Sequence, residues 1–201
     1  MTIERPIFES VSLADGLKWS GGGGWCYQEK LDGIWHIRPV GTDILAGELV
    51  GDLFTPFDII AVDGQDIRSE PLSTRLAILR SIPGPQIEQG NGGEFLETVL
   101  ARGGEGIVAK PWDSPFGKDW VKCKREETHD CRVTEIHLSK MSAHLELNGE
   151  DCGWLAILSV EQFALAAPGK VAEVKCHSRH PSGKLREPVF VRWREDKQLQ
   201  L

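Results

Sequence analysis

The chain has 201 residues, enough for one medium-sized domain or two small ones. Apolar residues make up 40% of it, which supports a hydrophobic core and argues against disorder. No apolar run approaches the length of a membrane span, and the N-terminus shows no secretion signal. Five scattered cysteines without a C-x-x-C pair disfavour structural zinc and a disulfide framework, and indicate free thiols inside a cell.

The charge of the chain is uneven. The formal net charge is −7, which argues against a protein that simply coats nucleic acid. Residues 170–197 nevertheless hold eight Lys/Arg against four Asp/Glu, so this basic segment carries +4 and the remainder −11. A basic C-terminal segment on an acidic body predicts a localised anionic partner.

The first part of the chain combines strand-like and helix-like segments. Runs rich in β-branched and aromatic residues predict strands, and apolar periodicity ended by glycine or proline predicts helices. In chain order, we predict strands over 33–40, 43–51 and 54–63, helices over 71–84 and 92–104, and strands over 105–110 and 119–124. These segments indicate a mixed α+β domain over residues 1–126.

The second part of the chain predicts a different architecture. The expected strands cover 131–140, 142–148, 152–160, 170–178 and 187–194, with a short helix over 161–167 before the fourth strand. Five short strands with a helix in that place are typical of a small OB-fold barrel. We therefore expect an OB-fold domain over residues 127–201.

A lysine stands in the middle of the strand-like stretch YQEKLDGIW, residues 27–35. Lys30 is followed at once by a carboxylate and a glycine, Asp32 and Gly33. Lysine is rarely buried without a reason, yet a single K-x-D-G string also occurs by chance, as a solvated charge on a strand. The order of the segments that follow distinguishes the two interpretations.

Further segments follow Lys30 in a fixed order: Gly47–Val50 (GELV), the segment 57–79 that begins with Phe57, Glu105–Lys110 (EGIVAK), Trp120–Lys124 (WVKCK), and 182–197 with Arg194 to Lys197 at its end. Together with Lys30 to Gly33 they resemble the ordered motifs of the covalent nucleotidyltransferases, specifically ATP-dependent DNA ligases. The resemblance runs over residues 27–197. It implies an unusually compact ligase with an ATP-grasp-like adenylation domain of antiparallel sheets and helices, followed by an OB-fold.

The resemblance also implies a role for each matching residue. Lys30 would attack the α-phosphate of ATP, and Lys122 and Lys124, expected on an adjacent strand, would favour the neutral amine and neutralise the phosphate. Asp32 would lie near the phosphoramide. The implied nucleotide-binding residues are Glu29, Lys30, Gly33, Glu48 at the ribose, Phe57 on adenine, Glu105, Lys110 at a phosphate, Lys122 and Lys124.

Two further sets of residues complete the implied site. Glu105 and Asp32 would hold Mg²⁺, the second cofactor besides ATP. Arg194 and Lys197 would act catalytically by orienting pyrophosphate. Nicked double-stranded DNA would be the partner, contacted through the basic side chains Lys175, Arg179, Lys184, Arg186 and Arg192.

The sequence departs from the family pattern between Gly33 and Glu48, where only 14 residues stand and a DNA-gripping Ser-Arg pair is absent. Trp35 occupies a position where the family commonly has arginine. We therefore expect a monomer that binds DNA weakly and relies on the basic segment 170–197 or on a DNA-binding partner protein, in the cytoplasm of a bacterial or phage-infected cell.

Several alternatives stay open. An RNA ligase and a capping guanylyltransferase share the central motifs, although the Arg-x-Asp-Lys end and segment 57–79 favour a DNA ligase. A degenerate, noncatalytic nick- or nucleotide-binding module is a third. Some of the implied site residues, taken singly, also have a purely structural interpretation. Phe57 could belong to the strand core, and Glu105 could be an ordinary loop carboxylate. Lys122 and Lys124 could form a solvated face of a strand.

Overall fold

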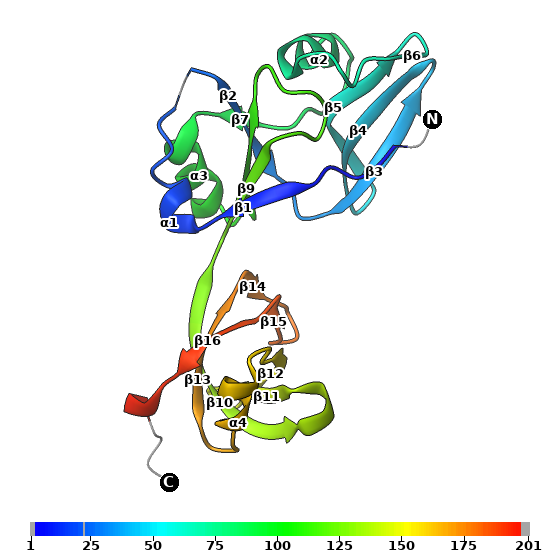
Figure 1. Cartoon of the computed structure of the whole chain (residues 1–201). Helices are drawn as coiled ribbons and strands as arrows, with labels where there is room; N and C mark the ends of the chain where they lie inside the picture. The colour runs from blue at the N-terminus through cyan, green and yellow to red at the C-terminus, as the bar shows by residue number, and fades with distance from the viewer. Residues whose placement is uncertain (1–2, 22, 198–201) are drawn as a thin grey trace. The chain divides into compact units, whose positions relative to one another are not determined.

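The computed structural model describes residues 3–21 and 23–197 (Figure 1). The chain divides into two compact units, Met1–Arg125 and Glu126–Leu201. The division falls one residue before the domain boundary expected from the sequence. In the described part of the chain, no helix combines the length and apolar character that crossing a membrane requires.

The first unit contains a sheet with the strand order β1-β9-β8-β2-β7. These strands are β1 (Phe8–Val11), β2 (Trp25–Lys30), β7 (Gln89–Gly90), β8 (Gly106–Pro111) and β9 (Trp120–Lys124). β1 runs parallel to β9, whereas the other pairs are antiparallel. The expectation of antiparallel sheets is corrected here, because the four-residue β1 is too short to show a sequence period and was not predicted.

Two helices cover this sheet, α1 (Leu13–Gly16) and α3 (Gly92–Ala101). They contact each other as well as strands β8 and β9 (Figure 1). Phe95, Leu96 and Val99 on α3 pack against Tyr27 and Ile107 of the sheet to form an apolar core. The α3 helix ends at Ala101, three residues before the end of the predicted helix over 92–104.

A second sheet of the first unit has the strand order β3-β4-β5-β6. Its members are β3 (Ile34–Val40), β4 (Asp43–Val50), β5 (Leu53–Val62) and β6 (Gln65–Asp66). Helix α2 (Leu72–Leu79) packs on β5, and a fully buried ion pair joins the two, with Arg75 Nε 2.9 Å from Asp58 Oδ1. The predicted helix 71–84 is thus too long, since the chain leaves the helix at Arg80 before reaching Pro83.

The second unit is built on a sheet with the order β12-β11-β10-β13-β16. Its strands are β10 (Glu127–His137), β11 (Ser142–Leu147), β12 (Glu150–Ala156), β13 (Val171–Cys176) and β16 (Val189–Trp193). The smaller elements are η1 (Leu138–Lys140), α4 (Val160–Ala164), β14 (Ser178–Arg179), β15 (Leu185–Arg186) and η2 (Glu195–Lys197).

The core of this unit includes Val133, Leu145, Leu155 and Val174, which are all buried. The predicted mixed α+β class is confirmed.

Candidate active site

Lys30 is the last residue of β2 and borders a cavity of the first unit. Gln28 stands two residues earlier and lines the same cavity, as expected for side chains on one face of a strand. Five side chains that were predicted to bind the nucleotide line this cavity: Glu29, Lys30, Glu48, Phe57 and Lys110. Segments far apart in the sequence therefore meet at this cavity, whereas four other predicted nucleotide-binding residues are not among its lining residues: Gly33, Glu105, Lys122 and Lys124.

One carboxylate lies between two of the predicted catalytic lysines. Glu105 Oε2 is 2.7 Å from Lys30 Nζ, and Glu105 Oε1 is 2.9 Å from Lys124 Nζ. The three side chains are between 13% and 20% exposed, so solvent screens them only partly. Glu105 thus holds the expected nucleophile and a second cation in one place.

The strand register explains this arrangement. Gly106 of β8 is paired with Lys30 on one side and with Lys124 on the other. A Cβ atom at Gly106 would stand 2.0 Å from the carbonyl oxygen of Cys123, so the close approach of β9 requires glycine. The expectation that Lys124 lies on a strand adjacent to Lys30 is wrong, because β8 separates β2 from β9.

Glu48 of β4 lies near the same lysine. Burial raises the pKa of its carboxyl group, while the charges of Lys30 and Arg5 oppose that shift. The backbone N–H of Gly33 donates a hydrogen bond to the Glu48 carboxylate. A Cβ atom at Gly33 would stand 2.4 Å from the carbonyl oxygen of Leu49, so the glycine of the K-x-D-G string allows β4 to approach.

An aromatic region forms another part of the cavity wall. Phe57 of β5 and Trp120 of β9 meet edge to face, with ring centroids 6.0 Å apart. Lys110 Nζ lies 4.4 Å from the Phe57 centroid and 3.8 Å from the Trp120 centroid. Burial lowers the pKa of Lys110 to about 8, and nearby Asp58 opposes the shift. Lys110, which was predicted to reach a phosphate, thus lies against two aromatic rings.

Three cavity-lining side chains that the sequence analysis did not assign carry unsatisfied polar atoms. In the part of the chain that the structure describes, Gln28 Oε1, Trp35 Nε1 and Trp120 Nε1 are buried without a hydrogen-bond partner. Gln28 Nε2, in contrast, donates to the carbonyl oxygen of Phe57 at 3.1 Å. One acceptor and two donors therefore stand ready for a polar ligand or water. The alternation of Gln28 with Lys30 was the signal that could have identified it.

Asp32 and Lys122, two further residues that were predicted to be catalytic, are not among the residues that line the cavity. Asp32 is exposed and follows the end of β2. Lys122 lies on β9 two residues before Lys124, with its Nζ 6.0 Å from the Phe8 ring centroid. Both lysines are half-buried and alternate along one strand face, as their spacing predicts.

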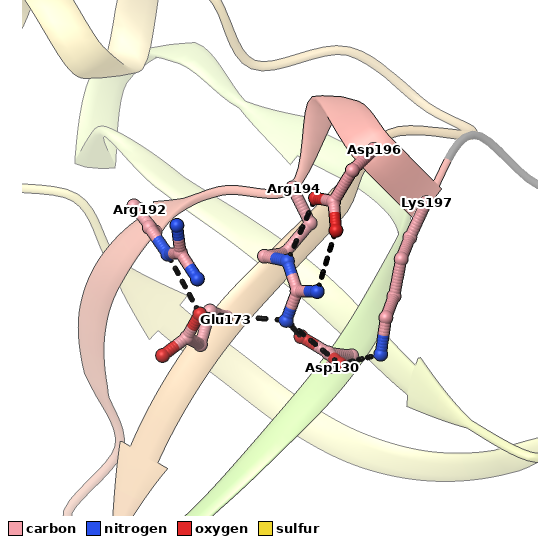
Figure 2. A network of polar contacts seen from close by, with 6 residues as sticks. All are labelled: Asp130, Glu173, Arg192, Arg194, Asp196 and Lys197. Carbon is pink, nitrogen blue, oxygen red and sulfur yellow. Dashed lines mark hydrogen bonds and ion pairs between the residues drawn. The ribbon is translucent and has the colours of Figure 1, made fainter.

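Arg194 and Lys197, the predicted pyrophosphate ligands, belong to the second unit and are held by carboxylates there (Figure 2). Asp130 of β10 accepts from both, at 2.9 Å from Arg194 Nη1 and 2.5 Å from Lys197 Nζ. Asp196 accepts a paired contact from Arg194 Nε and Nη2 at 2.9 and 2.7 Å. These bonds raise the pKa of Arg194 and lower that of Asp196.

The same network includes Glu173 of β13, which accepts from Arg192 Nε at 2.8 Å and approaches Arg194 Nη1 at 3.5 Å (Figure 2). Three cations thus face three carboxylates. Arg194 has four of its five N–H groups directed at carboxylates, so a phosphate that accepts from two N–H groups would have to displace at least one carboxylate contact.

The predicted DNA-binding residues are partly engaged within the second unit. Lys175 Nζ lies 2.6 Å from Glu126 Oε1, Arg179 Nη2 lies 2.8 Å from Glu150 Oε2, and Arg192 is bound to Glu173. Lys184 is exposed, and Arg186 is half-buried on β15. The net charge of the basic segment therefore overstates the positive charge that it presents to an anion.

Comparison with known proteins gives partial sequence matches. No protein-family model matches the chain. It is 33% identical over 115 residues to a probable DNA ligase of Anaeromyxobacter dehalogenans, covering 51% of the chain and 21% of the relative. It is 31% identical over 121 residues to a probable DNA ligase of Kineococcus radiotolerans, covering 53% and 22%. The chain spans about a fifth of the length of the curated relatives that it matches.

Solved structures match over nearly the whole chain. A structure from a study of Lig E DNA ligases and of DNA binding with a minimal scaffold aligns with a TM-score of 0.75 and 17% identity, covering 96% of this chain and all of that one. A structure described as Pmar-Lig_PreS3 aligns with a TM-score of 0.65 and 13% identity, covering 94% and 68%. The fold is shared with these proteins, and the resemblance to DNA ligases is confirmed at that level.

Proposed function

We propose that this chain is an ATP-dependent DNA ligase that seals nicks in duplex DNA through a lysyl-AMP intermediate. The observation that carries the proposal is the position of Lys30, which lines the cavity with Glu48 and Phe57 and is held 2.7 Å from Glu105. The curated relatives named probable DNA ligases and the fold likeness to Lig E ligases support the same activity.

The proposed reaction has three transfers. Lys30 Nζ, having lost its proton, forms a bond to the α-phosphorus of ATP while the bond to pyrophosphate breaks. The AMP then moves to the 5′-phosphate at a nick, and Lys30 leaves. Finally the adjacent 3′-hydroxyl attacks that phosphate, AMP leaves, and the strand is joined.

The residues of the cavity fit the nucleoside part of ATP. Phe57 offers a ring for stacking on a base, and Glu48 is a half-buried acceptor for ribose hydroxyls. The unsatisfied Gln28 Oε1, Trp35 Nε1 and Trp120 Nε1 atoms call for a polar ligand in that cavity. Glu29 and Lys110 complete the set of predicted nucleotide-binding residues on its wall.

The charged residues around Lys30 fit the triphosphate. Lys124 and Lys122 would neutralise the phosphate under attack. Mg²⁺, when bound, would neutralise charge on the phosphate oxygens, and Glu105 and Asp32 are the carboxylates that we assign to it. Both oxygens of Glu105 already contact ammonium groups, so the ion would compete with Lys30 and Lys124 for this carboxylate.

We assign the second unit to the OB-type fold and to DNA contact. The outer strands β12 and β16 of its sheet contact each other, which supports closure into a barrel. Lys184, Arg186 and the paired residues Lys175, Arg179 and Arg192 would face the phosphates of nicked DNA. Because several of these charges are already paired, we expect weak, salt-sensitive binding by a monomer that relies on a partner protein.

A nick-sealing assay tests this function. With ATP, Mg²⁺ and a duplex carrying a 5′-phosphate nick, the chain should join the strands, whereas Lys30→Ala and Lys30→Arg should be inactive because neither offers a neutral amine. Lys18→Ala, which removes an exposed lysine of the same unit, is the matched control and should remain active. Preferential sealing of an RNA nick would favour the RNA ligase alternative, and absence of any sealing would refute the proposal.

A further inference from the structure

The second unit contains three different metal-ligating side chains at one place outside the proposed active site. Glu127 and His129 belong to β10, and Cys176 is the last residue of β13. Their potential ligand atoms all lie within 4.8 Å of one another. The sequence spacing gave no sign of this group, because strand pairing brings together residues that are almost fifty positions apart.

The strand register explains why these side chains converge. In the antiparallel pair of β10 and β13, Glu127 stands directly opposite Cys176, so their side chains share one face of the sheet. His129 lies two residues further along β10 and therefore projects from the same face. The β-ladder thus fixes the backbone positions of all three residues independently of any ion.

We propose that Glu127, His129 and Cys176 form a transition-metal site that takes Zn²⁺. The carboxylate, the imidazole and the thiolate would supply three ligands, and water would supply the fourth. A thiolate with an imidazole selects zinc-like ions over Mg²⁺ or Ca²⁺, which prefer all-oxygen sites. The site is separate from the nucleotide cavity, so it stands or falls independently of ligase activity.

The distances suit a tetrahedral ion. With zinc bonds of about 2.0–2.3 Å, neighbouring ligand atoms of a tetrahedral site lie roughly 3.3–3.7 Å apart. His129 Nε2 is 3.3 Å from Glu127 Oε2, within that range. The Cys176 sulfur lies within 4.8 Å of the ligand atoms of Glu127 and His129, so a small side-chain adjustment brings it into the same range.

The sulfur is buried and already accepts one hydrogen bond. Cys176 is only 2% exposed, and the backbone N–H of Ser178 donates to its sulfur. A bound ion would take the place of the thiol proton, which passes to solvent, and would neutralise Glu127, while the Ser178 N–H would remain as a supporting hydrogen bond.

Cobalt(II) provides a direct probe, because a cobalt–thiolate bond gives a charge-transfer absorption band. The full chain, treated with a chelator and dialysed under reducing conditions, is titrated with Co²⁺ and then with Zn²⁺. We expect one equivalent of Co²⁺ to produce the thiolate band and one equivalent of Zn²⁺ to remove it. A chain that develops no thiolate band and takes up no Zn²⁺ at micromolar concentrations would overturn the proposal.

Variants identify the ligands. Cys176→Ser should lose the charge-transfer band, and His129→Gln, at a half-buried position that tolerates change, should weaken Zn²⁺ uptake by about 100-fold or more. Cys131→Ser is the matched control, since this buried cysteine of β10 is outside the group of three and should keep the band. Thermal unfolding verifies that each variant is folded. An unchanged band in Cys176→Ser, or unchanged Zn²⁺ uptake in folded His129→Gln, would contradict the assignment.

Discussion

Both units contain one carboxylate that lies between two cations, and the comparison shows how burial changes the meaning of the same pattern. In the first unit Glu105 joins Lys30 and Lys124. In the second unit Asp130 joins Arg194 and Lys197. All four cations belong to segments that resemble the ligase motifs.

The two groups differ in exposure and in charge balance. Lys30, Lys124 and Glu105 are at most 20% exposed, and one carboxylate faces two cations. Arg194 is 16% exposed, as little as the first group, whereas Lys197 is 50% exposed, and additional carboxylates balance the second group completely. Ion pairs near solvent contribute little and exchange easily, whereas partly desolvated charges depend on their partners. We infer that the first group is fixed and that the second releases Lys197 to a phosphate more easily than Arg194.

The largest effect is expected from Glu105→Gln, which removes the charge that holds Lys30 and Lys124. Formation of the AMP adduct and sealing of a nick that already carries AMP should both fall by about 10²–10³ in rate, the usual effect of losing an electrostatic partner in such a site. Single-turnover assays measure the two steps. Glu97→Gln, at an exposed position of α3, is the control. Activity of Glu105→Gln within a few-fold of the parent would show that Glu105 is a loop carboxylate.

Arg194→Ala and Lys197→Ala should affect one step. Adduct formation with ATP should fall by about 10²–10³, because these cations orient pyrophosphate in our proposal. Sealing of a pre-adenylylated nick without ATP should change much less. Lys140→Ala, which removes an exposed lysine of η1 in the same unit, serves as the control. Equal losses on the two substrates would assign Arg194 and Lys197 to structure or DNA binding.

Lys110→Met tests what burial does to a single cation. Burial lowers the pKa of Lys110 from 10.5 in the unfolded chain to about 8 in the folded protein. Below pH 8 the side chain is charged in both states, and the full free-energy cost of burying the charge then opposes folding. Between about pH 8 and 10.5 the unfolded state binds more protons, and the penalty disappears as pH rises. Allowing for lost ring contacts, Lys110→Met should raise the unfolding free energy at pH 7 by about 1–3 kcal/mol. Urea unfolding at pH 7 and pH 10 should show this gain only at pH 7, and equal differences would exclude the burial penalty.

The smallest effect is expected from Asp130→Asn. Its carboxylate would compete with ATP for Arg194 and for Lys197, which is 50% exposed, so the ATP concentration for half-maximal adduct formation should fall by up to about fivefold. Glu135→Gln, at an exposed position of the same strand, should leave it unchanged. A large loss of activity in Asp130→Asn would instead make this carboxylate a positioning residue that the two cations require.

The sequence predicted elements best where local pattern and packing agree. The strands around 33–40, 43–51 and 54–63 were predicted within one residue at each end, since each combines β-branched residues with a glycine or turn. The four-residue β1 and the two-residue β14 and β15 were not predicted. Such short strands show no sequence period and form because they pair with a neighbouring strand. The helix ends were placed too late because glycine and proline mark only the latest possible end.

Part of the candidate site was predictable for a similar reason. Lys30, Glu48 and Phe57 follow from ordered motifs, and the cavity collects them. The motifs assigned no role to three other lining residues, Gln28, Trp35 and Trp120. Their polar atoms are buried without a hydrogen-bond partner, and only the packing of the folded chain reveals this. The carboxylate partners Asp130 and Glu173 are far from Arg194 in sequence, and strand pairing in the second unit supplies them.

The most direct test of the central claim is peptide mass spectrometry of the chain after incubation with ATP and Mg²⁺. We expect one AMP per chain, attached to the peptide that contains Lys30, and its removal by added pyrophosphate. Lys30→Ala should carry none, and Arg194→Ala should acquire it slowly. An AMP group on another residue, or efficient sealing by Lys30→Ala, would contradict the assignment of Lys30 as the nucleophile.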